Sequence, residues 1–121
     1  MTEITHILIA EDEALSAMYL EMALKKIGYY ITIVATGEEA IRAFMQKNID
    51  ILMLDIHLAG EMDGIEAAQK IRDINEVPII FMSGYEVEIM GKRFENIDYS
   101  AFLVKPIDIS DLTEILKKVI S

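Results

Sequence analysis

The sequence contains no cysteine, which excludes a disulfide framework and a thiolate metal site. Only two of its 121 residues are histidines, and neither belongs to a metal-binding motif, so we expect no histidine metal centre. No apolar run approaches the roughly 18 residues of a membrane span. The first six residues, MTEITH, also lack the basic and apolar regions of a secretory leader. We therefore expect a soluble, cytoplasmic protein without a membrane partner.

Basic residues are scarce. Lysine and arginine number 11 against 21 aspartates and glutamates, which gives a net charge of −10 at pH 7. A charge of this sign opposes contact with phosphate backbones and anionic membrane surfaces. We therefore expect no direct contact with nucleic acid.

The length and the hydrophobic content, 53% of 121 residues, fit one domain of common size with a sizeable core. Linkers, internal repeats and low-complexity tracts are lacking as well. We expect a single domain over residues 1–121. The eight methionines are interpreted as core filling rather than as a binding surface.

The pattern that is present is a short apolar segment followed by an amphipathic one, repeated along the chain. The predicted strands cover residues 7–10, 30–35, 49–55, 77–82 and 101–104. The third has no polar face between Ile51 and Leu54, which is typical of a strand buried on both sides in a parallel sheet.

The amphipathic segments that follow these strands predict five helices. The first carries Leu15, Met18, Tyr19 and Met22 at helical spacing and ends at Gly28. Thr36 with Glu39 predicts a capping box for the second, and Ser110 is the expected cap of the last. The expected buried positions of the later helices are Ala40, Ile41, Phe44 and Met45; Ile65, Ala68, Ile71 and Ile74; and Leu112, Ile115, Leu116, Val119 and Ile120. A thinner apolar stripe predicts a short fourth helix over 86–96.

Alternating strands and helices with short connections predict an α/β fold, in which a parallel sheet carries helices on both faces. The commonest strand order for five such units is 2-1-3-4-5, the flavodoxin-like doubly wound arrangement. In this order the first and third strands are neighbours at the switch point, where ligands bind outside the carboxyl ends of the strands.

Polar residues follow four of the predicted strands at that edge: Glu11, Asp12, Asp55, Ser83 and Lys105. Three crowded carboxylates repel one another unless a cation neutralises them. Oxygen ligands without thiolate favour Mg²⁺, with Mn²⁺ as the alternative. A lysine and a hydroxyl opposite such an ion would complete a cradle for a tetrahedral anion such as a phosphoryl group.

These residues carry a resemblance. Glu-Asp at 11 and 12, Asp-Ile-His-Leu from 55, Asp-Gly at 63 and 64, Ser-Gly at 83 and 84 and Lys-Pro at 105 and 106 occur in the right order at the right strand ends. Along its whole length the chain resembles a receiver domain of the response regulators of two-component signalling, and is similar to the single-domain chemotaxis regulators. The departures are alanine rather than proline at position 59, one extra residue before Asp63, phenylalanine at 102 and serine at 83.

The resemblance implies a phosphorylation-dependent switch that is not an enzyme beyond its own phosphoryl transfer and autodephosphorylation. Asp55 would accept the phosphoryl group from the phosphohistidine of a histidine kinase or a phosphotransfer protein. Glu11, Asp12, Asp55 and the backbone carbonyl of His57 would hold Mg²⁺. Lys105 would pair with the phosphoryl oxygens.

The resemblance also assigns a switch. Ser83 would hydrogen-bond to the phosphoryl group, and Phe102, at the switch aromatic position, would turn inward and change the surface of the fourth helix, fifth strand and fifth helix. The Lys105–Pro106 peptide would be cis. We further hypothesise that His57 and Tyr85 shield the acyl phosphate and set its lifetime.

Several alternatives remain open at this stage. One is a phosphorylation-independent interaction module. Another is a Mg²⁺ phosphatase with an aspartate nucleophile, which would need a second aspartate where this chain has His57. An FMN carrier would need a phosphate loop where Glu11 to Glu13 repel phosphate. The chain is either a stand-alone regulator or the receiver part of a longer protein, its downstream effector is undetermined, and a phosphorylation-linked homodimer is considered.

Overall fold

The computed structural model describes residues 4–84 and 97–120. Five strands form one parallel sheet: β1 (His6–Ala10), β2 (Tyr30–Val34), β3 (Ile51–Asp55), β4 (Ile79–Ser83) and β5 (Ala101–Val104). The strand order is β2-β1-β3-β4-β5, so the predicted order is confirmed. All five residues of β3 and of β4 are buried, which agrees with the unbroken apolar runs in these central strands.

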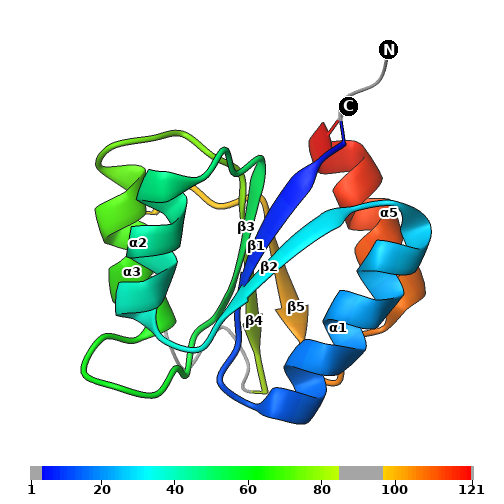
Figure 1. Cartoon of the computed structure of the whole chain (residues 1–121), viewed down its shortest axis with the longest axis horizontal. Helices are drawn as coiled ribbons and strands as arrows, with labels where there is room; N and C mark the ends of the chain where they lie inside the picture. Colours follow the sequence, from blue (N-terminus) through cyan, green and yellow to red (C-terminus); the bar gives the residue numbers. More distant parts are fainter. Residues whose placement is uncertain (1–3, 85–96, 121) are drawn as a thin grey trace.

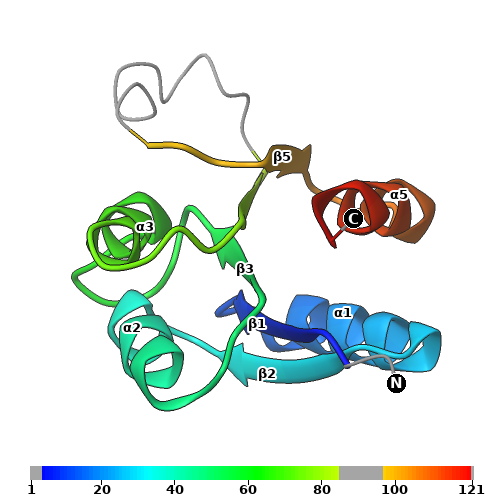
Figure 2. The same ribbon diagram turned by 90° about the horizontal axis from the view of Figure 1, so that it is seen from above.

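The helices cover both faces of the sheet, as Figures 1 and 2 show. On one face lie α1 (Ala14–Ile27) and α5 (Ile109–Ile120), and on the other lie α2 (Gly37–Gln46) and α3 (Gly64–Arg72). Each face has its own hydrophobic core, one around Leu52, Leu54 and Phe81 and the other around Met53 and Ile80. The described residues contain four helices, and the predicted helix over 86–96 lies outside them.

The expected apolar face of α1 was wrong. Leu15, Met18, Tyr19 and Met22 are all exposed, and the helix buries Ala17, Leu20 and Leu24 instead. Both sets have helical spacing, because this helix is apolar on opposite sides. The periodicity alone therefore did not select the side that faces the sheet.

Two helix ends follow their predicted caps. Gly28 ends α1 with a φ of 115°, and its N–H donates to the Lys25 carbonyl at 3.0 Å. The Thr36 hydroxyl accepts from the Glu39 N–H at 3.1 Å, although the Glu39 carboxylate accepts from that hydroxyl rather than from the Thr36 backbone.

The expected cap of α5 was displaced by two residues. Asp108, not Ser110, accepts from the backbone N–H at the start of this helix, with 3.1 Å between its Oδ1 and the Asp111 nitrogen. Met45, Ile74 and Ile120 are exposed, contrary to expectation. Met45 and Ile120 lie in the last turns of α2 and α5, and Ile74 lies beyond the end of α3. Within the described residues no helix is long and apolar enough to cross a membrane.

Candidate functional site

The carboxyl ends of the parallel strands bring the expected polar residues to one edge of the sheet. Glu11 directly follows β1, Asp55 ends β3 and Ser83 ends β4. Lys105 follows β5, and its backbone N–H donates to the Ser83 carbonyl at 2.8 Å. The sheet register therefore delivers residues separated by up to 94 positions to one place.

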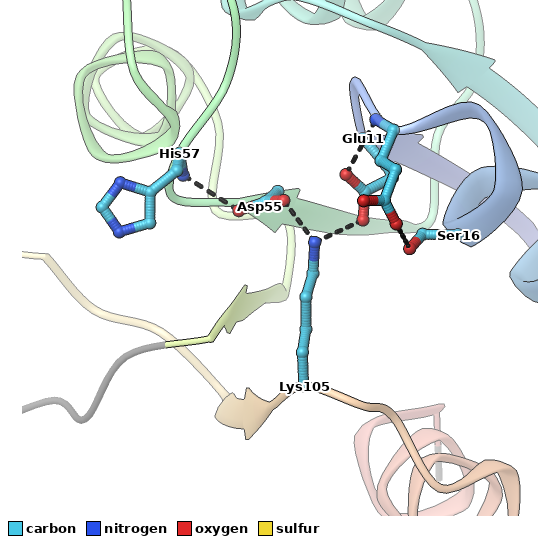
Figure 3. A network of polar contacts seen from close by, with 6 residues as sticks. Glu11, Ser16, Asp55, His57 and Lys105 are labelled. Atoms are coloured by element: carbon cyan, nitrogen blue, oxygen red, sulfur yellow. Dashed lines mark hydrogen bonds and ion pairs between the residues drawn. The ribbon is translucent and has the colours of Figure 1, made fainter.

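Lys105 joins two of the carboxylates (Figure 3). Its ammonium nitrogen lies 2.5 Å from Glu11 Oε1 and 2.5 Å from Asp55 Oδ2. The Glu11 side chain is fully buried, the Asp55 side chain is 6% exposed and the Lys105 side chain is 25% exposed. One cation thus compensates two buried anions, an arrangement that needs good geometry to offset the cost of desolvation.

The pKa values of this cluster are perturbed by opposing effects. Burial raises the pKa of Glu11, and the Lys105 hydrogen bond and the Glu13 backbone N–H, which donates to Glu11 Oε2 at 3.2 Å, only partly oppose it. Burial alone would lower the pKa of Lys105, but its bonds to Asp55 and Glu11 outweigh this and raise it. Lys105 is therefore held protonated by the anions that it bridges.

Asp12 completes an acidic cluster with the two buried carboxylates. One oxygen from each of Glu11, Asp12 and Asp55 lies within 4.8 Å of the others, and Asp12 is exposed. The candidate metal ligands are all hard carboxylate oxygens. Lys105 compensates only part of their mutual repulsion, so a second cation would be stabilised here. This set suits Mg²⁺ or Mn²⁺, which accept carboxylates and retain waters on their open side.

The loop after β3 is held against the Asp55 carboxylate. The His57 N–H donates to Asp55 Oδ1 at 2.9 Å, while its exposed imidazole points away from Lys105 (Figure 3). Asp55 Oδ1 thus accepts from the backbone amide, and Oδ2 accepts from the ammonium. Tyr85, the other residue expected to set the lifetime, lies outside the described residues.

Glycine at position 64 is required by a close approach that sequence inspection did not identify. A Cβ added to Gly64 would lie 2.1 Å from the Asp55 carbonyl oxygen. Asp63 caps α3 just before it in a reciprocal capping box with Glu66, so the helix start is fixed against the backbone of the site. The signal was present in Asp63-Gly64 followed by Glu66.

The loop between β3 and α3, which contains the extra residue before Asp63, contacts the start of α2. Thr36 and Ala59 form a parallel β-bridge, and Met62 packs so closely on Gly37 that a Cβ there would lie 3.1 Å from its side chain. Gly60 adopts a φ of 95°, which favours glycine. These contacts were not predicted, because Ala59 to Met62 show no helix or strand pattern and lie more than 20 residues along the chain from Thr36 and Gly37.

The remaining expected residues lie around this cluster. Ser83 is fully buried at the end of β4. Phe102 pairs with Phe81 in the β4–β5 register and packs, half-buried, against the core on the α2 and α3 side. The Lys105–Pro106 peptide is cis, as the resemblance implied. A groove lined by Leu15, Tyr19 and Pro106 opens onto Glu11 and Lys105 from the side of α1.

A doubly wound sheet with a lysine and three carboxylates at its switch point is the arrangement that the resemblance to receiver domains implies. Comparison with known proteins agrees with it. The family model for the response regulator receiver domain matches residues 7–117. The chain belongs to this family, the receiver domain of two-component response regulators.

Curated relatives match most of the chain. The transcriptional regulatory protein PdtaR of Mycobacterium tuberculosis is 34% identical over 116 residues, which are 95% of this chain and 56% of the relative. The probable transcriptional regulator ycf27 of Guillardia theta is 32% identical over 94% of this chain and 44% of the relative. The chain therefore spans about half the length of these relatives.

Solved structures show the same fold. The response regulator TrrA of Thermotoga maritima, solved in complex with Mg²⁺ and BeF, has a TM-score of 0.85 and 30% identity, covering 96% of this chain and 99% of that one. A CheY-like receiver domain protein of Methanospirillum hungatei has a TM-score of 0.89 and 25% identity, covering 96% and 93%.

Proposed function

We propose that Asp55 accepts a phosphoryl group from a phosphohistidine and that the chain is a phosphorylation-dependent switch. The observation that carries this proposal is the bridge from Lys105 to Asp55 and Glu11 beside a third carboxylate. A lysine and a divalent cation on opposite sides of one carboxylate can neutralise the oxygens of an incoming phosphoryl group.

A divalent cation, Mg²⁺ or Mn²⁺, would be held by Glu11, Asp12, Asp55 and the His57 carbonyl. When bound, it supplies positive charge to the phosphoryl oxygens in the transition state. With part of the Glu11 charge compensated by such an ion, Lys105, whose ammonium lies 2.5 Å from Asp55 Oδ2, would be available to pair with the transferred group.

In the transfer, an Asp55 oxygen forms a bond to phosphorus while the phosphorus–nitrogen bond of the phosphohistidine breaks, and its electron pair stays on the imidazole nitrogen. The His57 amide and Lys105 each hold one Asp55 oxygen, so the carboxylate is oriented before the donor arrives. The chain would catalyse only this transfer and the later hydrolysis of its own acyl phosphate.

The response would pass through β4 and β5. Ser83 would donate a hydrogen bond to the new phosphoryl oxygens, and Phe102 would move inward and alter the surface of β5 and α5. His57 and Tyr85 would limit water access to the acyl phosphate.

The phosphodonor would be a histidine kinase or a phosphotransfer protein of the cytoplasm. Since the relatives include transcriptional regulators, the effector could be a DNA-binding domain in the same or another chain, whereas this acidic domain would contact no nucleic acid itself.

Labelling by a small phosphodonor tests the proposal. Wild-type protein with acetyl phosphate and Mg²⁺ should gain the mass of one phosphoryl group, and Asp55→Asn should not. Asp73→Asn, which changes an exposed aspartate at the end of α3, is the matched control and should label normally. Absence of label on the wild type, or label that persists in Asp55→Asn, would contradict the proposal.

A further inference from the structure

The loop between β3 and α3 is fixed at both of its ends beside Asp55. At its start the His57 N–H donates to Asp55 Oδ1 at 2.9 Å, and at its end the Gly64 N–H donates to the Ile56 carbonyl at 2.9 Å. A Cβ added to Gly64 would lie 2.1 Å from the Asp55 carbonyl oxygen, so the start of α3 rests on the backbone of Asp55. A change at the Asp55 carboxylate therefore reaches an amide of this loop directly.

The middle of the same loop is fixed to the first turn of α2. We call residues 59–62 the strap. Ala59 forms a parallel β-bridge with Thr36, which is the N-cap of α2. Met62 packs on Gly37, the first residue of that helix, so closely that a Cβ on Gly37 would lie 3.1 Å from the Met62 side chain. Because the loop is fixed at its ends and in its middle, a shift of the strap requires the first turn of α2 to shift with it.

A buried oxygen beside the strap has no partner within the described residues. Glu38 Oε1 is this oxygen, and Glu38 Oε2 lies where a Cβ on Gly60 would approach it to 3.3 Å. A buried acceptor that is left unpaired costs free energy. A second arrangement of the strap that supplied a donor to Glu38 would therefore compete with the present one, and two competing arrangements are what a coupling element requires.

We propose that the strap couples the Asp55 carboxylate to the first turn of α2, so that phosphorylation of Asp55 changes the start of α2 as well as the surface of β5 and α5. The response to phosphorylation rests on the proposed function, whereas the coupling itself exists in the resting protein. An acyl phosphate replaces one carboxylate charge with up to about two negative charges and three acceptor oxygens. The His57 N–H, which now donates to Asp55 Oδ1, gains competing acceptors in that state.

The responding surface is separate from the one around β5. The helix α2 follows β2, and β2 and β5 form opposite edges of the sheet (Figure 2). Ala59, Gly60 and Glu61 of the strap are exposed. A change at the strap and the start of α2 would therefore give the chain a second surface from which its state can be recognised.

Hydrogen exchange of the unphosphorylated protein, measured amide by amide, tests the coupling. Thr36→Ala removes the hydroxyl that accepts from the Glu39 N–H and leaves the strap and Asp55 unchanged in sequence. We expect the His57 amide, on the other side of the strap, to exchange about fivefold faster in this variant, as expected for loss of one helix cap. Thr36→Ser keeps the hydroxyl and is the matched control, with His57 exchange at the wild-type rate. Faster exchange at Glu39 without a change at His57 would overturn the proposal.

Amide chemical shifts with Mg²⁺ and beryllofluoride, a stable mimic of the acyl phosphate, test the response. In the wild type the Gly37 and Glu38 amides should shift together with the Ser83 amide. Met62→Ala should lose the shifts at Gly37 and Glu38 and keep the one at Ser83. Met45→Ala, which truncates an exposed methionine in the last turn of α2, is the control and should keep all three.

The outcomes separate this inference from the proposed function. A protein in which the Ser83 amide does not respond would contradict the proposed function, and with it the response of α2. A response at Ser83 with none at Gly37 and Glu38, or one at α2 that Met62→Ala leaves intact, would overturn the role of the strap alone.

Discussion

Replacing Lys105 with methionine tests the central electrostatic contact of the site. The variant keeps the apolar stem and removes only the charge that compensates Glu11 and Asp55, each 2.5 Å from the ammonium. Breaking one partner out of a buried pair costs about 3 to 5 kcal/mol. Because the Lys105 side chain is 25% exposed and water can reach it, we expect the lower end, about 3 kcal/mol, in metal-free protein at neutral pH.

The loss of stability in Lys105→Met should depend on pH with a definite sign. A carboxyl group whose folded pKa is raised stabilises fully below its unfolded value and loses that contribution as pH rises through the folded value. Burial already raises the pKa of Glu11 from its usual 4.5, and removing the lysine raises it further. The gap between variant and wild type should therefore be small near pH 4.5 and grow towards neutral pH.

Urea unfolding of both proteins at a series of pH values measures this difference in the free energy of unfolding, provided that the free energies of the two proteins fall with urea concentration at the same slope. Lys25→Met is the control, since the Lys25–Glu21 pair is exposed and should be worth only about 0.3 to 0.5 kcal/mol. Millimolar Mg²⁺ should narrow the gap if the ion replaces the lysine charge. A loss for Lys105→Met below about 1 kcal/mol, or one that is the same at pH 4.5 and 7, would refute the reasoning.

Three other substitutions have defined outcomes. Gly64→Ala should cost at least about 2 kcal/mol in thermal unfolding and slow phosphorylation, because its Cβ would meet the Asp55 carbonyl oxygen. Gly84→Ala should be nearly neutral, because a Cβ there would meet none of the described residues within 4 Å. Leu24→Ala should cost about 2 to 5 kcal/mol and Leu15→Ala less than about 0.5 kcal/mol by urea unfolding. The reverse order would show that α1 buries the face that carries Leu15. Thr36→Ala should cost about 1 kcal/mol through loss of the α2 cap, with Thr36→Ser restoring most of it, and equal stability of both variants would contradict this.

Much of the fold could be predicted because its signals are local. The apolar run from Ile51 to Leu54 is best interpreted as a strand buried on both faces, and alternating elements with right-handed crossovers indicate a parallel sheet. The predicted strand order is the commonest one for five such units, and the structure confirms it. Gly28 and Thr36 end and begin helices by chemistry that lies within a few residues. Helix faces were less certain, and α1 shows why. Its two apolar sides are equivalent in sequence, and only the sheet decides which one is buried.

The sequence also determined which residues would meet at the site. Residues at the carboxyl ends of parallel strands share one edge whatever the details of packing, so Glu11, Asp55, Ser83 and Lys105 could be placed together before any coordinates. Tertiary structure alone decided that Lys105 would bridge two carboxylates, that Gly64 would pack on the Asp55 backbone and that the longer loop would attach to Thr36. The physical reason is that these contacts depend on distances between segments far apart in the chain, which no local pattern encodes.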